Sequence, residues 1–306
     1  MRPPRLPSAR LLAFLLPLVG AVASPAAGFD LQAHRGGRGL APENSLAAFG
    51  RALALGVATL ELDLVVSRDE RILIGHDLEL DPAKVRTPDG RWLEPPGPAV
   101  HTLEAEQLRR FDIGRLDPAS PYARRFPDQQ PADGERMPTL AELAAMLEAR
   151  GARSVRLFLE TKLRPDRPEL APPPERFAEL LVAELRRLDL LARSTVQSFD
   201  WRTLRAVQRL APELPTACLT ARQPWLDNLA DGSWTAGFRL EAVGGSVPRL
   251  VAAAGCRIWA PFHGDLAPLD IRRAENLGLL VVPWTVDEPE RMRELVGQGV
   301  HGLITD

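Results

Sequence analysis

Excess positive charge, long apolar runs, cysteine and histidine are all scarce in this sequence of 306 residues. The formal net charge is −2, so the composition argues against nucleic acid or an anionic membrane surface as a partner. Beyond residue 23 no apolar run approaches the roughly 20 residues that a membrane-spanning helix needs, and we expect no stable membrane anchor in the mature chain. Two cysteines and five dispersed histidines argue against a zinc site.

The first 23 residues predict a signal peptide. Arg2, Arg5 and Arg10 supply a positive amino-terminal region, and residues 11–23 form an apolar run. Ala21-Val22-Ala23 has the small–x–small pattern of a cleavage site. A retained anchor is the alternative, but the apolar run is shorter than a spanning helix requires. We therefore expect a periplasmic or secreted protein.

The two cysteines, Cys218 and Cys256, could form a disulfide in such an oxidising compartment. Cys218 falls well along one predicted strand and Cys256 just before another, which places them toward opposite ends of the fold. Two buried thiols are therefore the favoured expectation, and a disulfide stays open.

Short β-type segments alternate with helical patterns along most of the chain. Several of these segments are continuous apolar runs, which are typical of parallel strands covered on both faces. Thr139, Asp200, Ser246 and Asp287 each precede an apolar helical pattern and predict helix caps. The alternation predicts an α/β fold in which residues 29–306 form one (β/α)₈ barrel. The predicted strands are 31–35, 59–66, 155–161, 195–199, 216–220, 257–261, 280–286 and 302–306.

Two regions interrupt the alternation. The second predicted strand, 59–66, continues through a polar turn at 67–70 into residues 71–76, which is the pattern of a β-hairpin. Residues from about 80 to 137 are rich in proline, aspartate and glycine and predict a loop-rich insertion after that hairpin. A loop of this length in a compact domain is usually functional or mobile, but the sequence does not give its role.

Two acidic residues share one face of the second predicted strand. Because strand side chains alternate, Glu61 and Asp63 point one way and the neighbouring leucines point the other way. The leucine row matches the helix-covered outside, so the carboxylates are expected in the interior, where they are costly without compensation. Glu160, at the end of the next parallel strand, is predicted to join them. Three carboxylates favour a hard divalent cation, Ca²⁺ or Mg²⁺; structural acids paired with arginine are the alternative.

Other chemically informative residues fall at the same predicted strand ends. Lys162 is one of only two lysines in the chain, and a compact ammonium suits a phosphate oxygen beside a metal. His34 closes the first strand and His76 closes the hairpin arm, so two imidazoles can divide acid and base roles. Arg35 is a candidate phosphate clamp. For the remaining histidines we predict no catalytic role.

Together these motifs resemble the glycerophosphodiester phosphodiesterase family. The matching segments follow in order over almost the whole mature chain, and their combination is specific although each one is short. They are His34-Arg35-Gly36, Pro42-Glu43-Asn44-Ser45, Glu61-Leu62-Asp63, His76-Asp77, Pro138-Thr139-Leu140, Glu160-Thr161-Lys162, Gln197-Ser198-Phe199, Trp284-Thr285-Val286 and Gly302-Leu303-Ile304-Thr305-Asp306.

The resemblance implies metal-dependent hydrolysis of a small-molecule glycerophosphodiester to glycerol 3-phosphate and an alcohol, on a barrel with an insertion. It also implies the role of each matching residue. These roles are a divalent cation at Glu61, Asp63 and Glu160, acid–base catalysis by His34 and His76, phosphate binding by Arg35 and Lys162, a glycerol pocket at Trp284, and a supporting or metal-linked carboxylate at Glu43.

The sequence departs from the family pattern at Asp287, where asparagine is common, and at His301, where aspartate is common. Asp and Asn cap helices about equally well, so we expect Asp287 as a helix cap and His301 outside the site. Two other functions stay open, a phospholipase D- or sphingomyelinase-like lipid phosphodiesterase and a non-catalytic glycerophosphodiester-binding protein. The sequence does not decide the headgroup, the cation, which histidine is the acid, or the oligomeric state.

Overall fold

Eight parallel strands form the centre of the molecule. The computed structural model describes residues 28–306, so the predicted signal peptide lies outside the described residues. The strand order along the sheet is β10-β9-β6-β5-β4-β2-β1-β11. The strands are β1 (Asp30–Ala33), β2 (Thr59–Val66), β4 (Arg156–Thr161), β5 (Ser194–Ser198), β6 (Thr216–Thr220), β9 (Ile258–Pro261), β10 (Leu280–Val281) and β11 (Gly302–Thr305).

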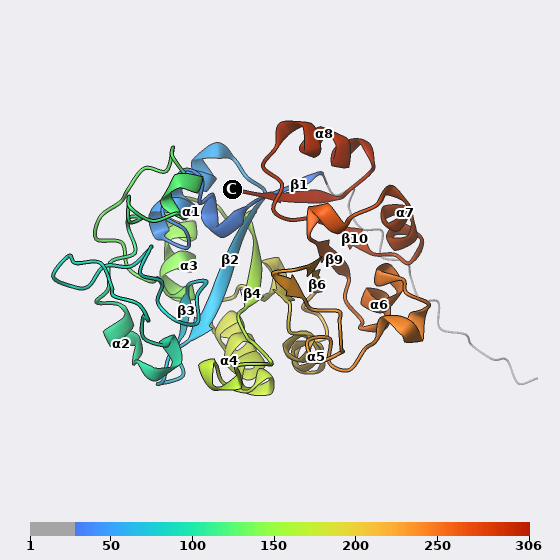
Figure 1. Cartoon of the computed structure of the whole chain (residues 1–306), viewed down its shortest axis with the longest axis horizontal. Helices are drawn as coiled ribbons and strands as arrows, with labels where there is room; N and C mark the ends of the chain where they lie inside the picture. Colours follow the sequence, from blue (N-terminus) through green and yellow to red (C-terminus); the bar gives the residue numbers. More distant parts are fainter. Residues whose placement is uncertain (1–27) are drawn as a thin grey trace, which may run out of the picture.

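Hydrogen bonds between the two outer members of this order close the sheet into a barrel. His301 N donates to Val281 O at 2.9 Å, and Ile304 N donates to Pro283 O at 3.0 Å. The predicted strand 280–286 is shortened to β10 because Pro283 has no N–H to donate, but the chain beyond it still pairs with β11. Figure 1 shows the ring of helices around the strands. The predicted (β/α)₈ barrel is confirmed.

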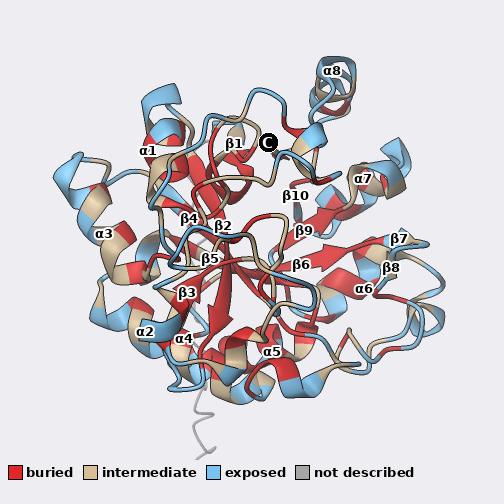
Figure 2. Ribbon diagram, turned by 60° about the vertical axis from the view of Figure 1, so that its left-hand side comes forward, coloured by how far each residue is buried: buried red, intermediate tan, exposed pale blue. Residues whose placement is uncertain are grey.

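Helices cover the outside of the barrel. Figure 2 shows buried strands enclosed by helices whose outward sides are exposed. None of the helices within residues 28–306 combines the length and apolar character needed to cross a membrane. The helices are α1 (Leu46–Leu55), α3 (Leu140–Ala149), α4 (Pro174–Arg187), α5 (Trp201–Leu210), α6 (Val247–Ala253), α7 (Pro268–Asn276) and α8 (Pro289–Gly297).

Two of the four predicted helix caps are confirmed, and Ser246 stands at the N-cap of α6 without a side-chain hydrogen bond to that helix. Thr139 forms a capping box at the start of α3, and the Asp200 carboxylate accepts a hydrogen bond from the first turn of α5. The cap predicted at Asp287 is wrong, because α8 begins one residue later and its N-cap makes no side-chain hydrogen bond. Asp287 Oδ1 instead accepts from Asp306 N at 2.9 Å. Its side chain therefore fixes the end of β11.

The two faces of β2 have opposite environments, as predicted. Leu60, Leu62 and Leu64 belong to the large apolar core that includes the helices. The intervening acids face the barrel interior, which also contains a separate apolar cluster. The carboxylates therefore share the interior with this cluster. Its members are Phe158, Ala217, Ile258, Val282 and Ile304, with Trp284 packed against them.

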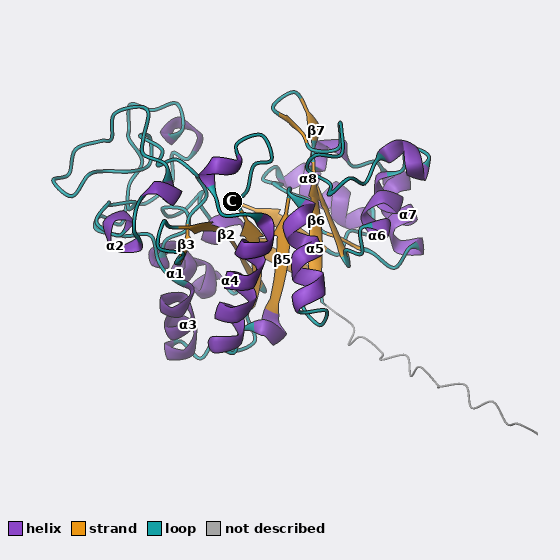
Figure 3. Cartoon of the chain, turned by 90° about the horizontal axis from the view of Figure 1, so that it is seen from below, coloured by secondary structure: helices purple, strands orange, loops and turns teal. Residues whose placement is uncertain are grey.

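The predicted hairpin and insertion are both present. Strand β3 (Ile72–Ile74) pairs antiparallel with β2. The insertion that follows contains the four-residue helix α2 (Ala105–Leu108) and short 3₁₀ turns, and is otherwise loop. Val85 and Val100 are buried and anchor it to the core. Figure 3 shows the insertion and the β7–β8 hairpin (Arg222–Gln223 and Leu226–Asp227) rising above the same end of the strands.

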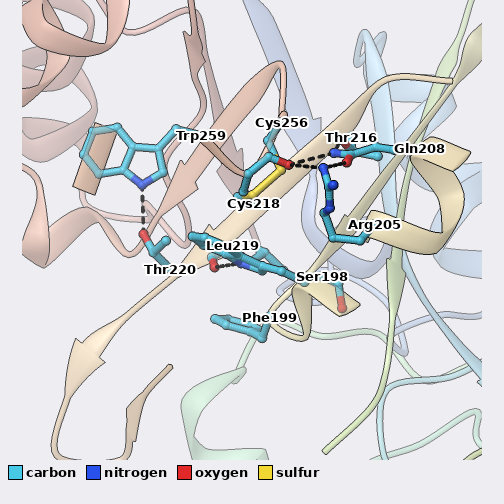
Figure 4. The surroundings of a disulfide bond; sticks show 12 residues. Ser198, Phe199, Arg205, Gln208, Thr216, Cys218, Leu219, Thr220, Cys256 and Trp259 are labelled. Carbon is cyan, nitrogen blue, oxygen red and sulfur yellow. Dashed lines mark hydrogen bonds between the residues drawn. A yellow bond between two sulfur atoms is a disulfide. The ribbon is translucent and has the colours of Figure 1, made fainter. Parts of the chain in front are cut away.

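The expectation of two free thiols is wrong. Cys218 and Cys256 form a disulfide with a Cα–Cα distance of 5.9 Å (Figure 4). The positions were expected at opposite ends of the fold, but β6 and β9 are adjacent strands and Cys218 pairs in register with Trp259. Cys256 lies just before β9, so it is within reach of the neighbouring strand.

Candidate active site

Three buried carboxylates meet where β2 and β4 end. The register pairs Asp63 with Glu160, and Glu61 lies two residues earlier on the same face of β2. One oxygen of each carboxylate lies within 4.8 Å of the others. All three are almost inaccessible to solvent, with exposures of 1%, 1% and 8% for Glu61, Asp63 and Glu160. The structure thus brings together the predicted metal ligands.

The electrostatics of this cluster fit a bound divalent cation. Burial and the neighbouring Asp63 and Glu160 carboxylates raise the pKa of Glu61 well above its ordinary value. Burial likewise raises the pKa of Glu160 to about 7. Asp63 Oδ1 is buried and has no hydrogen-bond partner among the described residues. A bound cation would lower the pKa values of Glu61 and Glu160, because it stabilises the ionised carboxylates, and it would coordinate the unpaired Asp63 Oδ1.

Arginine pairing alone does not account for the acids. Arg35 Nε lies 3.3 Å from Asp63 Oδ2, but the same guanidinium also donates to Glu43 Oε1 at 2.9 Å. Lys162 Nζ donates to Glu160 Oε1 at 2.7 Å and lies 3.6 Å from Asp63 Oδ1. Although burial raises the pKa of Asp63, Lys162 and Arg35 bring it below its ordinary value. The other two carboxylates keep raised pKa values, so their charge is incompletely compensated.

The two predicted phosphate ligands flank the carboxylates from different elements. Arg35 sits at the end of β1 with φ +52°, and its backbone N–H donates to Glu61 Oε2 at 2.8 Å. This strained turn points the Arg35 N–H toward Glu61, while the guanidinium extends toward Asp63 and Glu43. Lys162 follows β4 directly. Both side chains line the cavity described below.

Each predicted catalytic histidine is bonded to a carboxylate through Nδ1. His34 Nδ1 lies 2.5 Å from Asp306 Oδ1, and His76 Nδ1 lies 2.7 Å from Asp77 Oδ1. This pairing holds Nδ1 as the donor and leaves Nε2 as the ring nitrogen available for proton transfer. Burial lowers the pKa of His34, and burial with nearby Arg35 and Lys162 lowers that of His76 to about 4. These lowered pKa values favour the neutral imidazole, which is the form that can accept a proton.

A cavity of about 690 Å³ opens above the carboxylates. Both histidines, Glu61, Glu160 and Lys162 line it. One wall is aromatic and includes the predicted Trp284, whose Nε1 donates to Ala260 O at 2.9 Å. The other aromatic members are Phe199, Trp225 and Trp234. A phosphodiester in this cavity would contact cations at its centre and rings at one side.

Sequence reasoning missed several residues at the site. Lys84 is the second of the chain's two lysines, and Tyr122 is its single tyrosine; the rarity argument applied to Lys162 would have pointed to both. Arg38 could not be singled out from the sequence, because arginine is common in this chain. Asp77 and Asp306 stood in the resembling segments but were given no role. Among the other histidines, His301 lies at the opposite end of β11, as predicted, where Nδ1 accepts from Val281 N.

The chain is similar to known proteins along nearly its full length. A model described as the glycerophosphoryl diester phosphodiesterase family matches residues 34–306. A glycerophosphodiester phosphodiesterase of Caldanaerobacter subterraneus is 28% identical over 278 residues, which cover 90% of this chain and 92% of that protein. A Bacillus subtilis protein of the same name is 28% identical over 284 residues, with 90% and 82% covered.

Solved structures agree with the sequence comparisons. A Silicibacter pomeroyi protein, assigned as a glycerophosphoryl diester phosphodiesterase, is 33% identical with a TM-score of 0.82, and the match covers 92% of this chain and 91% of that one. An Oleispira antarctica phosphodiesterase, solved with the product sn-glycerol-3-phosphate, has the same fold at 20% identity and a TM-score of 0.65, with 90% and 92% covered. This chain belongs to the glycerophosphoryl diester phosphodiesterase family.

Proposed function

We propose that this protein hydrolyses glycerophosphodiesters to glycerol 3-phosphate and an alcohol with the help of a bound divalent cation. The observation that carries the proposal is the cluster of Glu61, Asp63 and Glu160 at a cavity that is also lined by two imidazoles, each paired with a carboxylate. Family membership and the product bound to the Oleispira phosphodiesterase support the choice of substrate.

Glu61, Asp63 and Glu160 are the proposed cation ligands. An all-carboxylate set favours Ca²⁺ or Mg²⁺ over zinc. When bound there, the cation would supply positive charge against the non-bridging oxygens of the phosphate. Gln197 Nε2 and the Arg35 N–H each donate to one oxygen of Glu61, at 2.7 and 2.8 Å, and so fix the orientation of this ligand.

The chain's own residues account for charge neutralisation and proton transfer. Lys162 and Arg35 hold phosphate oxygens and stabilise the negative charge that builds in the transition state. Nε2 of one histidine removes a proton from the nucleophile, which is water or the adjacent glycerol hydroxyl. Nε2 of the other histidine, with its imidazole in the protonated form, donates its proton to the departing oxygen. Asp306 and Asp77 stabilise whichever imidazole becomes charged.

Conservative removal of a cation ligand tests the proposal. Glu61→Gln and Glu160→Gln keep the side-chain volume but lose the charge, and we expect kcat for glycerophosphocholine to fall at least about 100-fold. Glu213→Gln, at an exposed position, is the matched control and should keep full activity. Glycerol 3-phosphate release is measured in a coupled assay with and without chelator. Undiminished turnover in either site variant would overturn the proposal, and cation-dependent binding without turnover would favour the non-catalytic alternative.

A lipid-like substrate is the second candidate, favoured by one observation. Trp225 is 59% exposed at the cavity mouth, and its ring packs edge-on to Phe262 and Trp284 with centroids 5.5 and 6.1 Å apart. An exposed ring of this kind could contact an acyl chain. Comparing kcat/KM for glycerophosphocholine, lysophosphatidylcholine and sphingomyelin separates the two candidates. A preference for either lipid that is lost in Trp225→Ala would favour the second.

We also propose that residues 1–23 are a cleaved signal peptide and that the mature protein is periplasmic or secreted. The Cys218–Cys256 disulfide supports this, because disulfides persist mainly in oxidising compartments. Cell fractionation with amino-terminal sequencing of the mature protein tests it. A protein that keeps Met1 in the cytoplasmic fraction would contradict the proposal.

A further inference from the structure

The carboxylates that orient the two histidines are themselves each held by a buried cation. Arg38 Nε donates to Asp306 Oδ1 at 2.7 Å. Lys84 forms a salt bridge with Asp77 through Asp77 Oδ2, the oxygen that does not face His76. Arg38 and Lys84 are 7% exposed. Each histidine is therefore the end of a three-membered arrangement of imidazole, carboxylate and cation.

The two arrangements meet at Tyr122 and Glu43. Arg38 Nη1 donates to Tyr122 OH at 3.3 Å, and Tyr122 OH donates to Glu43 Oε2. Lys84 Nζ donates to Glu43 Oε1 at 3.1 Å. A continuous chain of polar contacts thus runs from one histidine to the other beside the three cation ligands. Its order is His34, Asp306, Arg38, Tyr122, Glu43, Lys84, Asp77 and His76.

Two of these links come from the insertion, which is anchored around them by aromatic packing. The Lys84 ammonium lies 5.1 Å from the centroid of the Tyr122 ring, and the Arg38 guanidinium lies 5.0 Å from that of Phe126. The Tyr122 and Phe126 rings meet edge-on at 5.1 Å. Burial and the Glu43 carboxylate raise the pKa of Tyr122 to about 12, which keeps the phenol protonated as a donor.

Lys84 also explains why a second acidic group beside the site need not hold a second metal. Oxygens of Glu43 and Asp77 and a ring nitrogen of His76 lie within 4.8 Å of one another, a spacing that could suit a metal ion. The ammonium of Lys84 contacts both carboxylates of this group. The Lys84 ammonium therefore supplies the positive charge that a second metal ion would otherwise supply to these two carboxylates.

We propose that Lys84 and Tyr122 are positioning residues through which the insertion orients the two catalytic histidines. The expected fall in kcat rests on the proposed function. Lys84 fixes Asp77 and through it the ring of His76. Tyr122 links Arg38, and through it Asp306 and His34, to Glu43. Neither side chain is required to touch the substrate.

Two variants test this in the full-length mature protein. Tyr122→Phe keeps the ring and removes only the hydroxyl, and Lys84→Met keeps an unbranched chain and removes the charge. Partners of this kind typically contribute between about 10- and 100-fold, so we expect kcat for glycerophosphocholine to fall by that factor with KM and cation affinity within about twofold. Thr102→Val, which removes an insertion hydroxyl bonded to Ala99 O at 2.6 Å outside the chain of contacts, is the matched control and should keep wild-type kcat.

Unchanged kcat in both variants would overturn the proposal. A joint loss of kcat, cation affinity and melting temperature would also overturn it, because that pattern indicates collapse of the insertion and not a misplaced imidazole. ¹⁵N-histidine NMR supplies a readout that needs no turnover. We expect the Nδ1-protonated tautomer for both rings in the wild type and mixed tautomers for His76 in Lys84→Met. If the wild type proves inactive on glycerophosphodiesters, the proposed function fails while this comparison still decides the positioning.

Discussion

At the scale of single residues, the choice of lysine distinguishes the site from the rest of the chain. Only Lys84 and Lys162 are lysines, and each lies between two carboxylates. Arginine is also present at the site, as Arg35 and Arg38, and elsewhere it forms mostly exposed pairs that contribute little to stability. A compact ammonium can sit between two acids where a planar guanidinium would have to turn one donor edge away.

Replacing Lys162 should separate phosphate binding from cation binding. In Lys162→Met we expect kcat/KM to fall about 100- to 1000-fold, since one donor to the developing charge is lost. Cation affinity should be kept or increase, because Glu160 and Asp63 lose a competing positive charge. Kinetics and calorimetric cation titration measure the two effects. A variant that keeps more than a third of wild-type kcat/KM would contradict the role given to this lysine.

Protonation of the cation ligands should make binding pH-dependent. Burial raises the pKa of Glu160 to about 7, so below that pH a proton must leave before a cation can bind. Apparent affinity should therefore rise with pH through this range and be at least about tenfold weaker at pH 6 than at pH 8. Calorimetric titrations of the metal-free protein check this. Equal affinity at both values would contradict it, and Glu160→Gln should reduce the dependence to the part that is due to Glu61.

The sequence predicts the metal ligands and the histidines but not the residues that orient them. Period-two alternation placed Glu61 and Asp63 on one face because that pattern depends only on local geometry. The partners of the histidines depend on distant contacts. His34 and Asp306 are 272 positions apart, and Tyr122 reaches Glu43 from an insertion without a repeating pattern.

At the scale of elements, strands with full backbone pairing were predicted best. The bounds of β2 and β6 agree with the prediction, whereas β10 is cut short by Pro283. The helix cap at Asp287 failed because its carboxylate bonds to β11 instead. Tertiary hydrogen bonds of this kind override local start signals, and a single sequence gives no sign of them.

The disulfide should stabilise the barrel without affecting catalysis. It closes a loop of 38 residues between β6 and β9, for which chain entropy gives about 4 kcal/mol of unfolding free energy. We expect Cys218→Ala with Cys256→Ala to lose most of that amount, with kcat unchanged because Cys218 belongs to the outer core. Urea unfolding with and without reductant measures it. Equal stability of oxidised wild type and the double variant would contradict this expectation.

At the scale of the whole molecule, the barrel follows from an alternation of strands and helices along most of the described chain. Parallel strands need crossover helices, and eight such units leave closure as the arrangement without open edges. The barrel matters for function because it places the last strand, β11, beside the first, β1, so that Asp306 meets His34. Figure 1 shows the end of the chain near the centre of the ring, next to β1.

The central claim is that three carboxylates on strands β2 and β4 hold one cation at the cavity lined by the two imidazoles. The most direct measurement is anomalous diffraction from crystals of the mature protein soaked in Mn²⁺ as a stand-in for Mg²⁺. We expect one strong peak bounded by oxygens of Glu61, Asp63 and Glu160, and its loss in Glu61→Gln. A peak beside Glu43 and Asp77 instead, or no peak at the three carboxylates, would contradict the account.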